Sequence, residues 1–159
     1  MENTIAIVLA AGKGTRMKSE KSKQVHKILG KEIVLRAVEN AKKAGIEDII
    51  AVVGYKKEQV QEVLKDSVKY VIQEEMLGTG HAVMQAKEFL EGKKGKVVVL
   101  NGDVPILRPE TIEKLIEKSN ANKEYVTLLS AIYENPWIWK NNKRRRRKCR
   151  RDCRRKRCK

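Results

Sequence analysis

Short apolar runs alternate with amphipathic segments along this chain, and this alternation constrains the fold more than any other feature. The runs are apolar at nearly every position, which is typical of strands that are buried on both faces. Strands are expected at residues 4–9, 48–53, 68–72, 96–100 and 125–132, and helices at 33–44, 57–64, 79–90 and 109–119. The alternation predicts a mostly parallel sheet with helices on both faces, which is a three-layer α/β fold.

The positive charge of the chain is concentrated at its carboxyl end. The formal net charge is +16, but residues 137–159 carry 14 Lys and Arg against one Asp, which leaves 22 basic and 19 acidic residues before them. All three cysteines and both tryptophans also lie in residues 137–159. The first 136 residues thus resemble an ordinary intracellular enzyme domain. No apolar stretch has the length of a signal peptide or a membrane span, so a cytoplasmic location is expected.

The strand at residues 4–9 leads into a glycine-rich turn. Residues 9–18 read Leu-Ala-Ala-Gly-Lys-Gly-Thr-Arg-Met-Lys. Small side chains let backbone N–H groups approach an anion, and the cations Arg16 and Lys18 follow at once. The pattern lacks the third glycine of a Rossmann fingerprint and the Gly-Lys-Ser/Thr of a Walker A loop. A glycine turn after a strand is often only a turn, but the cations that follow favour a phosphate-binding loop.

This segment resembles the amino-terminal signature of the sugar-nucleotide pyrophosphorylases, which is Gly-x-Gly-Thr-Arg followed several residues later by Pro-Lys. Lys23 stands where the family has its lysine, whereas Ser22 replaces the usual proline. Since proline would stiffen the approach to the lysine, this departure weakens the match at Lys23 slightly.

A second polar cluster follows the strand expected at residues 68–72. Residues 73–82 read Gln-Glu-Glu-Met-Leu-Gly-Thr-Gly-His-Ala. The carboxamide of Gln73 offers a donor and an acceptor to a pyrimidine edge. A plain alternative is a helix entry with Thr79 as N-cap and His81 in a structural role. The segment looks like the uracil-recognition segment of the bifunctional bacterial N-acetylglucosamine-1-phosphate uridylyltransferases.

A third cluster ends the strand at residues 96–100, where residues 97–105 read Val-Val-Val-Leu-Asn-Gly-Asp-Val-Pro. A carboxylate at the end of a buried strand suits Mg²⁺, which takes one or two carboxylates together with substrate phosphates. A Gly-Asp turn also occurs for purely structural reasons. The same family has Gly-Asp-Val-Pro here with the aspartate as metal ligand, and many members have tyrosine in place of Asn101.

Three motifs in this order make the resemblance extend over residues 3–136. It implies a Rossmann-like nucleotidyltransferase domain of the MobA-like kind, with Mg²⁺ as cofactor. Its nucleotide site would consist of Leu9, Ala10, Ala11, Gly12, Lys23, Gln73, Gly78, Thr79, Asn101, Gly102 and Asp103. By the same resemblance, Asp103 is the metal ligand. Arg16 and Lys23 are the catalytic cations.

The resemblance implies that UTP and N-acetylglucosamine-1-phosphate react to UDP-N-acetylglucosamine, a peptidoglycan precursor, and pyrophosphate. Positioning and charge neutralisation are the expected means of catalysis. Two enzymatic alternatives are a thymidylyltransferase and a molybdenum-cofactor guanylyltransferase. The non-enzymatic alternative is a basic nucleic-acid-binding protein whose binding falls steeply with salt. No specific nucleic-acid partner and no membrane partner is expected.

The character of the chain changes after Pro136. The cysteine spacing in residues 137–159 matches no common zinc pattern. Back-translation with adenine-rich codons and a shifted frame turns the segment from Trp137 into Gly-Tyr-Gly-Arg-Ile-Ile-Arg, which resembles the family's own continuation. Residues 137–159 are therefore expected to be a frameshifted, disordered tail, and the DNA across codons 135–137 tests this expectation.

If the frame has changed, the nucleotidyltransferase domain is truncated at its carboxyl end and its activity is low or absent. The trimerisation expected of the full-length family would also be lost, because the domain that provides it would be missing.

Overall fold

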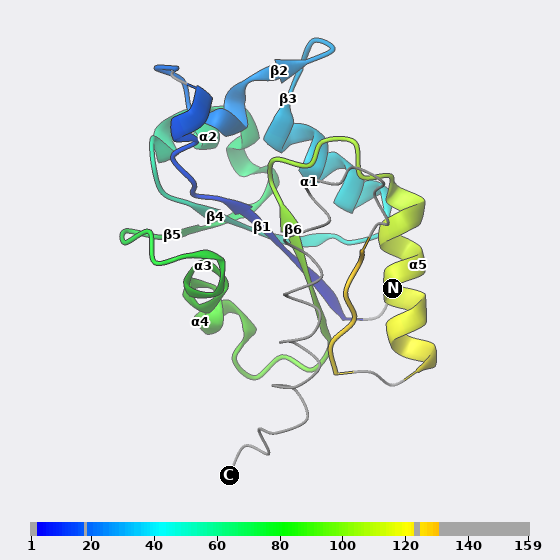
Figure 1. Cartoon of the computed structure of the whole chain (residues 1–159). Helices are drawn as coiled ribbons and strands as arrows, with labels where there is room; N and C mark the ends of the chain where they lie inside the picture. The colour runs from blue at the N-terminus through cyan, green and yellow to red at the C-terminus, as the bar shows by residue number, and fades with distance from the viewer. Residues whose placement is uncertain (1–2, 18, 123–124, 131–159) are drawn as a thin grey trace, which may run out of the picture. The chain divides into compact units, whose positions relative to one another are not determined.

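A four-stranded parallel sheet forms the centre of the fold (Figure 1). The computed structural model describes residues 3–17, 19–122 and 125–130. The sheet has the order β5-β4-β1-β6, with strands β1 (Thr4–Ala10), β4 (Asp48–Val53), β5 (Lys69–Ile72) and β6 (Lys96–Asn101). The α-helices are α1 (Ile33–Lys43), α2 (Lys57–Leu64), α3 (Thr79–Gln85), α4 (Lys87–Leu90) and α5 (Pro109–Ala121). The predicted alternation of parallel strands and helices is confirmed.

Helices cover the two faces of the sheet unequally (Figure 1). Successive residues of a strand point to opposite faces, so β1 sends Ala6 and Val8 to one face and Ile5 and Ile7 to the other. The first face carries the larger core, formed with α1, α2 and α5. The second face carries a smaller core with α3 and α4. Each fully buried valine or isoleucine stabilises the fold by roughly 1.5–3 kcal/mol, so most of the stability lies on the first face.

Strand β6 departs from the expectation that every strand is buried on both faces. Val98 and Leu100 are buried in the larger core, but Val97 and Val99 are 44% and 47% exposed. Helices α3 and α4 pack over β1 and β4, and the smaller core that they form contains no residue of β6. The apolar run alone could not reveal this, because exposure depends on which neighbour covers the strand.

Two predicted elements differ from the structure. The helix expected at residues 79–90 is interrupted at Ala86, whose N–H bonds the carbonyl of Val83 at 3.1 Å, a tighter turn than an α-helix makes. The turn keeps the Ala86 side chain buried against the sheet and separates α3 from α4. The strand expected at residues 125–132 is absent over 125–130, and 131–132 lie outside the described residues. Within the part of the chain that the structure describes, this segment has no hydrogen-bonded strand beside it, and local strand propensity alone does not hold a strand.

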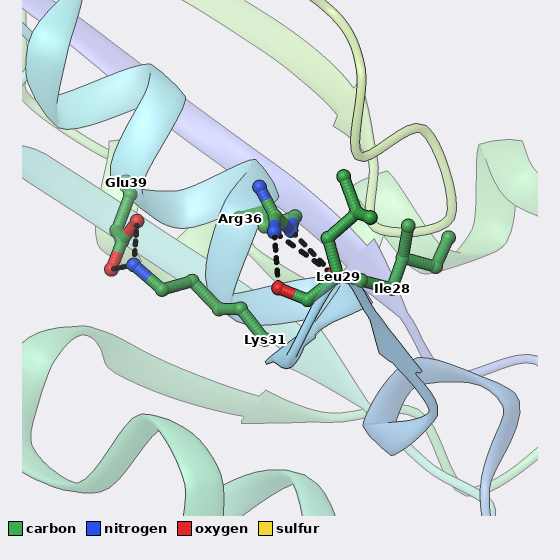
Figure 2. Close-up of polar contacts among 5 residues, drawn as sticks. All are labelled: Ile28, Leu29, Lys31, Arg36 and Glu39. Carbon is green, nitrogen blue, oxygen red and sulfur yellow. Dashed lines mark hydrogen bonds and ion pairs between the residues drawn. The ribbon is translucent and has the colours of Figure 1, made fainter.

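A small hairpin precedes α1 and is fixed to it by polar contacts (Figure 2). Its strands are β2 (Lys27–Ile28) and β3 (Lys31–Glu32). Arg36 of α1 donates to the carbonyls of Ile28 and Leu29 at 2.9–3.1 Å, and Lys31 pairs with Glu39 at 2.8 Å. These contacts fix the segment that runs from the phosphate loop into α1.

The turn of this hairpin consists of Leu29 and Gly30, both with positive φ (50° and 78°), which is the pattern of a type I′ hairpin turn. The sequence gives glycine at only one of these two positions. Leu29 therefore adopts the left-handed region despite its side chain, which is 91% exposed.

Candidate functional site

All three polar clusters lie at one edge of the sheet. Strands β1, β5 and β6 run parallel, so the segments that follow them leave from the same side. After β1 the chain continues to β4, which lies on one side of β1. After β5 it crosses to β6, which lies on the other side of β1. Open α/β sheets bind ligands at such a switch point, outside the carboxyl ends of the strands. The topology therefore places a candidate site beyond the ends of β1 and β6.

The predicted phosphate loop contacts the turn after β6. Leu9 lies opposite Asn101 in the strand register, and the N–H of Gly102 donates to the carbonyl of Leu9 at 2.9 Å. A Cβ at Gly102 would lie 2.8 Å from that carbonyl oxygen, so only glycine fits without a shift. Of the remaining loop residues, Ala10 and Ala11 are buried and Gly12 is exposed. The loop thus presents backbone around Gly12 to solvent.

The loop then turns toward Lys23. Gly14 has φ +60°, and a Cβ there would lie 2.8 Å from the Cβ of Lys23. The loop continues into a 3-10 turn, Thr15–Met17, in which the N–H of Met17 bonds the carbonyl of Gly14 at 2.9 Å. Arg16 has its backbone in this turn, but its side chain lies outside the described residues. Its predicted catalytic role stays a prediction.

Lys23 and Asp103 form an ion pair between two of the predicted motifs. The Nζ of Lys23 donates to the Oδ2 of Asp103 at 2.6 Å, and the side chains are 32% and 36% exposed. Lys23 begins a short 3-10 helix, Lys23–Val25, and the preceding N–H of Ser22 donates to the Oε1 of Gln59 at 2.7 Å. We call Lys23 and Asp103, together with the nearby Gly14 and Gly102, the charged cluster.

The charged cluster suits a metal ion that arrives with phosphate. Within the described residues no group of three or more His, Cys, Asp or Glu side chains could hold a metal by itself. Asp103 offers one partly exposed carboxylate, and Mg²⁺ is commonly held by one or two carboxylates plus substrate phosphates. The donor set therefore fits Mg²⁺ bound together with a nucleotide, and does not form a closed cage for a free ion.

A second set of contacts surrounds Gln73, which follows β5. Gln73 is only 3% exposed, and its Nε2 lies 3.2 Å from the carbonyl oxygen of Gly78 and 3.1 Å from the Nδ1 of His81. The Nε2 of His81 lies 3.0 Å from the side-chain amide of Gln85, one turn later in α3. We call Gln73, Gly78, His81 and Gln85 the amide cluster. It carries no formal charge when the imidazole is neutral.

The start of α3 differs from the alternative in which Thr79 is the N-cap. Thr79 is the first helical residue, and the N-cap is Gly78, with φ +105° and no side-chain capping bond. Both Gly78 and Thr79 are exposed. The positive φ explains why glycine is needed at 78.

Three residues of the site region were not singled out by sequence reasoning. Gly54 follows β4, and a Cβ there would lie 2.8 Å from the carbonyl oxygen of Gln73 and 3.1 Å from the Cβ of Ala11. It lets the phosphate loop and the Gln73 segment approach each other. Gln59 supports the segment before Lys23, and Gln85 extends the amide cluster. The glycine directly after an apolar strand was a signal for Gly54, whereas nothing local marks the two glutamines.

A separate hollow lies at the other edge of the sheet. It has a volume of about 640 Å³ and is lined by residues that include Asn3, Asp48, Leu90 and Lys93. Asp48 accepts from Lys69 and Lys93 at 2.9 Å, and these bonds, Lys69 first, hold the pKa of Asp48 below its usual range. The acid is thus already neutralised, and none of the predicted nucleotide-site or metal-site residues is among those that line this hollow.

A family model described as the MobA-like NTP transferase domain matches residues 6–157. The chain belongs to the MobA-like NTP transferase domain family. This assignment agrees with the parallel sheet and with the phosphate loop at its carboxyl edge. The family match extends beyond Pro136, where the sequence predicts a domain boundary, and that boundary stays a prediction.

Curated relatives of this family member carry the name bifunctional protein GlmU. The protein from Clostridium novyi (strain NT) is 50% identical over 133 residues, which are 83% of this chain and 29% of that protein. The protein from Caldanaerobacter subterraneus subsp. tengcongensis is 48% identical over 136 residues, 86% of this chain and 30% of that protein. The chain thus spans less than a third of the length of these relatives. The predicted resemblance to the bifunctional bacterial uridylyltransferases is confirmed over the aligned residues.

Solved structures of other proteins share the fold. A nucleotidyl transferase from Methanothermobacter thermautotroptrophicus (Mth528) matches with a TM-score of 0.61 at 21% identity, covering 74% of this chain and 58% of that one. HddC from Yersinia pseudotuberculosis complexed with GMP-PN matches with a TM-score of 0.60 at 29% identity, covering 72% and 53%. Rv0371c from Mycobacterium tuberculosis complexed with manganese has a TM-score of 0.63 at 22% identity, covering 75% and 60%.

The described residues contain no helix that is long and apolar enough to cross a membrane.

Proposed function

We propose that this domain binds UTP and N-acetylglucosamine-1-phosphate and transfers the uridylyl group, releasing pyrophosphate. The observation that carries the proposal is the meeting of the phosphate loop, Lys23 and Asp103 at the carboxyl ends of β1 and β6. The 50% identity to GlmU of Clostridium novyi supports the choice of substrates. An oxygen of the sugar phosphate attacks the α-phosphorus of UTP, and the bond to pyrophosphate breaks. No covalent intermediate on the protein is required, so positioning and charge neutralisation are the means of catalysis.

In this proposal the partners of the charged cluster change when nucleotide binds. Lys23 turns its ammonium group from Asp103 to the phosphate oxygens, where it donates charge-assisted hydrogen bonds. The released carboxylate of Asp103 would then be the side chain that holds Mg²⁺. When bound, Mg²⁺ supplies neutralisation of the charge that develops on the phosphates. The backbone around Gly12 is open to solvent, so its N–H groups can also approach the phosphates.

The amide cluster recognises the base in this proposal. Gln73 lies beside the start of α3, where Gly78 and Thr79 are exposed and a flat ring can approach the backbone. A buried carboxamide that is held in one orientation reads one edge of a base. Cytoplasmic location is part of the proposal, because both substrates are intracellular metabolites.

A guanine nucleotide is the second candidate. HddC, 29% identical over the shared fold, was crystallised with GMP-PN. Guanine also carries an N–H on its pairing edge, so a base contact made through the side-chain oxygen of Gln73 does not exclude guanine. Higher identity to the GlmU proteins favours UTP.

Two measurements on the 159-residue chain test the proposed function. Calorimetry in the presence of Mg²⁺ is expected to show tighter binding of UTP than of GTP or CTP. Any pyrophosphate release is expected to require UTP, the sugar phosphate and Mg²⁺ together, and to be slow if the frame has changed after Pro136 as the sequence predicts. Tighter binding of GTP would move the proposal to guanylyl transfer. Release of pyrophosphate without the sugar phosphate would contradict the transfer reaction.

A further inference from the structure

We propose that His81 is a positioning residue that sets base specificity by fixing the orientation of the Gln73 carboxamide. The inference rests on the proposed function, in which Gln73 contacts the base, and it assigns a role to a histidine that has no part in phosphate chemistry. The observation is the chain of contacts Gly78–Gln73–His81–Gln85 within the amide cluster.

The orientation of Gln73 follows from the atoms it meets. The carbonyl oxygen of Gly78 can only accept, so the group 3.2 Å away must be the Nε2 of Gln73 and not its oxygen. The second hydrogen of Nε2 points to the Nδ1 of His81 at 3.1 Å. Nδ1 must then accept, which places the imidazole proton on Nε2.

The tautomer in turn decides the orientation of Gln85. A neutral imidazole has one acceptor nitrogen, and Gln73 uses it. The Nε2–H of His81 therefore donates across the 3.0 Å contact, and Gln85 presents its carbonyl oxygen there. In this orientation the Nε2 of Gln85 can no longer donate to the carbonyl oxygen of His81, a contact that is longer, at 3.4 Å. Each step of the chain has one donor and one acceptor.

The result is a single acceptor that remains available on Gln73. Both hydrogens of its Nε2 are used, and no hydrogen bond within the described part of the chain reaches its Oε1. An acceptor at this position matches the N3–H of uracil. Cytosine has a lone pair on N3 and would be repelled.

Two variants separate positioning from a merely structural role. His81→Leu fills the space of the ring but removes the acceptor, so one of the two bonds that orient Gln73 is lost. His81→Asn keeps an acceptor, since its Oδ1 is attached to Cγ as Nδ1 is in histidine. Gln85→Leu removes only the far end of the chain of contacts.

The first measurement is the ratio of dissociation constants for Mg²⁺–CTP and Mg²⁺–UTP, by calorimetry on the full 159-residue chain. We expect the preference for UTP to fall about fivefold to tenfold in His81→Leu, to return in His81→Asn, and to fall less in Gln85→Leu. If His81 had only a structural role, His81→Leu would weaken the binding of both nucleotides equally and leave the ratio unchanged. That outcome would overturn the inference about His81 but not the proposed function. A wild-type chain without preference for UTP over CTP would overturn the proposed function as well.

The second measurement needs no ligand. The ¹⁵N chemical shifts of the His81 imidazole at neutral or higher pH distinguish the two tautomers, with His81→Asn identifying which signals belong to it. We expect the proton on Nε2 in the wild-type chain, and a mixture of tautomers in Gln73→Leu. A proton on Nδ1 in the wild-type chain would contradict the inference directly.

Discussion

The charged cluster and the amide cluster lie at the same edge of the sheet but are built differently. Lys23 and Asp103 are 80 residues apart in sequence and meet through one ion pair of 2.6 Å. The contacts of the amide cluster join residues four to eight positions apart, through neutral hydrogen bonds of 3.0–3.2 Å. The charged cluster thus depends on the topology of the sheet, whereas the amide cluster depends on one strand end and the first turns of α3.

The comparison teaches that the two clusters respond to different changes. An ion pair that is about one-third exposed is weak in water and exchanges partners readily when a phosphate or a metal ion arrives. A buried carboxamide with both hydrogens bonded resists reorientation, because an unpaired buried donor costs about 1–3 kcal/mol. The charged cluster is therefore suited to change during binding, and the amide cluster to stay fixed.

The largest effect is expected from Asp103→Asn. The change keeps the size of the side chain but removes the charge that holds Mg²⁺, so uridylyl transfer should fall at least about 100-fold. Pyrophosphate release in saturating Mg²⁺ measures it, and the variant is made in a chain whose frame is restored after Pro136 if the 159-residue chain itself shows no turnover. Asp48→Asn is the matched control, because it removes a lysine-paired aspartate at the opposite edge of the sheet. Equal loss in both variants would mean that the charged cluster has no special role.

Lys23→Met is expected to change the affinity for nucleotide and the affinity for metal in opposite directions. Loss of charge-assisted bonds to phosphate should weaken UTP binding about tenfold to 100-fold. Binding of Mn²⁺ alone should tighten, because Asp103 loses its competing cation. Calorimetry measures the nucleotide, and the electron paramagnetic resonance signal of free Mn²⁺ measures the metal.

The control for this prediction is Lys27→Met, which removes an exposed lysine paired with Glu32. It should leave both affinities unchanged. Weaker Mn²⁺ binding in Lys23→Met would show that Lys23 supports the metal site and does not compete for it.

Two glycine substitutions compare how much space the backbone leaves for a side chain near each of the two clusters. Gly102→Ala places a Cβ 2.8 Å from a backbone oxygen of Leu9, so the strand ends must shift, at a cost of about 1–3 kcal/mol in the free energy of unfolding. Gly80→Ala, in α3 beside the amide cluster, meets no atom within 4 Å and should stabilise the chain by about 0.5–1 kcal/mol. Urea denaturation measures both. Similar effects of the two changes would remove the steric part of the comparison.

The smallest effect is expected from Asp48→Asn at the edge opposite the site. The pKa of Asp48 is lowered in the folded chain, so this carboxylate stabilises the fold above its unfolded pKa, near 3.8, and loses that contribution as the pH falls through the folded pKa. Because the side chain is partly exposed, Asp48→Asn should cost only about 0.5 kcal/mol at neutral pH. Thermal unfolding between pH 7 and pH 3 should show the difference between the two chains shrinking below pH 4. A difference independent of pH would contradict the assignment.

Much of the fold could be predicted from local patterns. The apolar run at residues 48–53 and the amphipathic run at 57–64 coincide with β4 and α2, because burial of one periodic face decides each element. The strand expected at 125–132 was wrong over 125–130, since a strand also needs a hydrogen-bonded neighbour. The exposure of Val97 and Val99 was not predictable either, because it depends on where α3 and α4 lie.

The candidate site divides in the same way. By itself, the sequence determined the three motifs, their place after strands, and the types of residue available, because these depend on spacing along the chain. Only the tertiary structure decided that Lys23 bonds Asp103, that Gly54 lets the Gln73 segment approach Ala11, and that both hydrogens of the Gln73 amide are used. The physical reason is that a hydrogen bond forms only when the distance between donor and acceptor is right to within a few tenths of an ångström. Such distances are set by how the strands are ordered and how the helices pack on them, which no local pattern specifies.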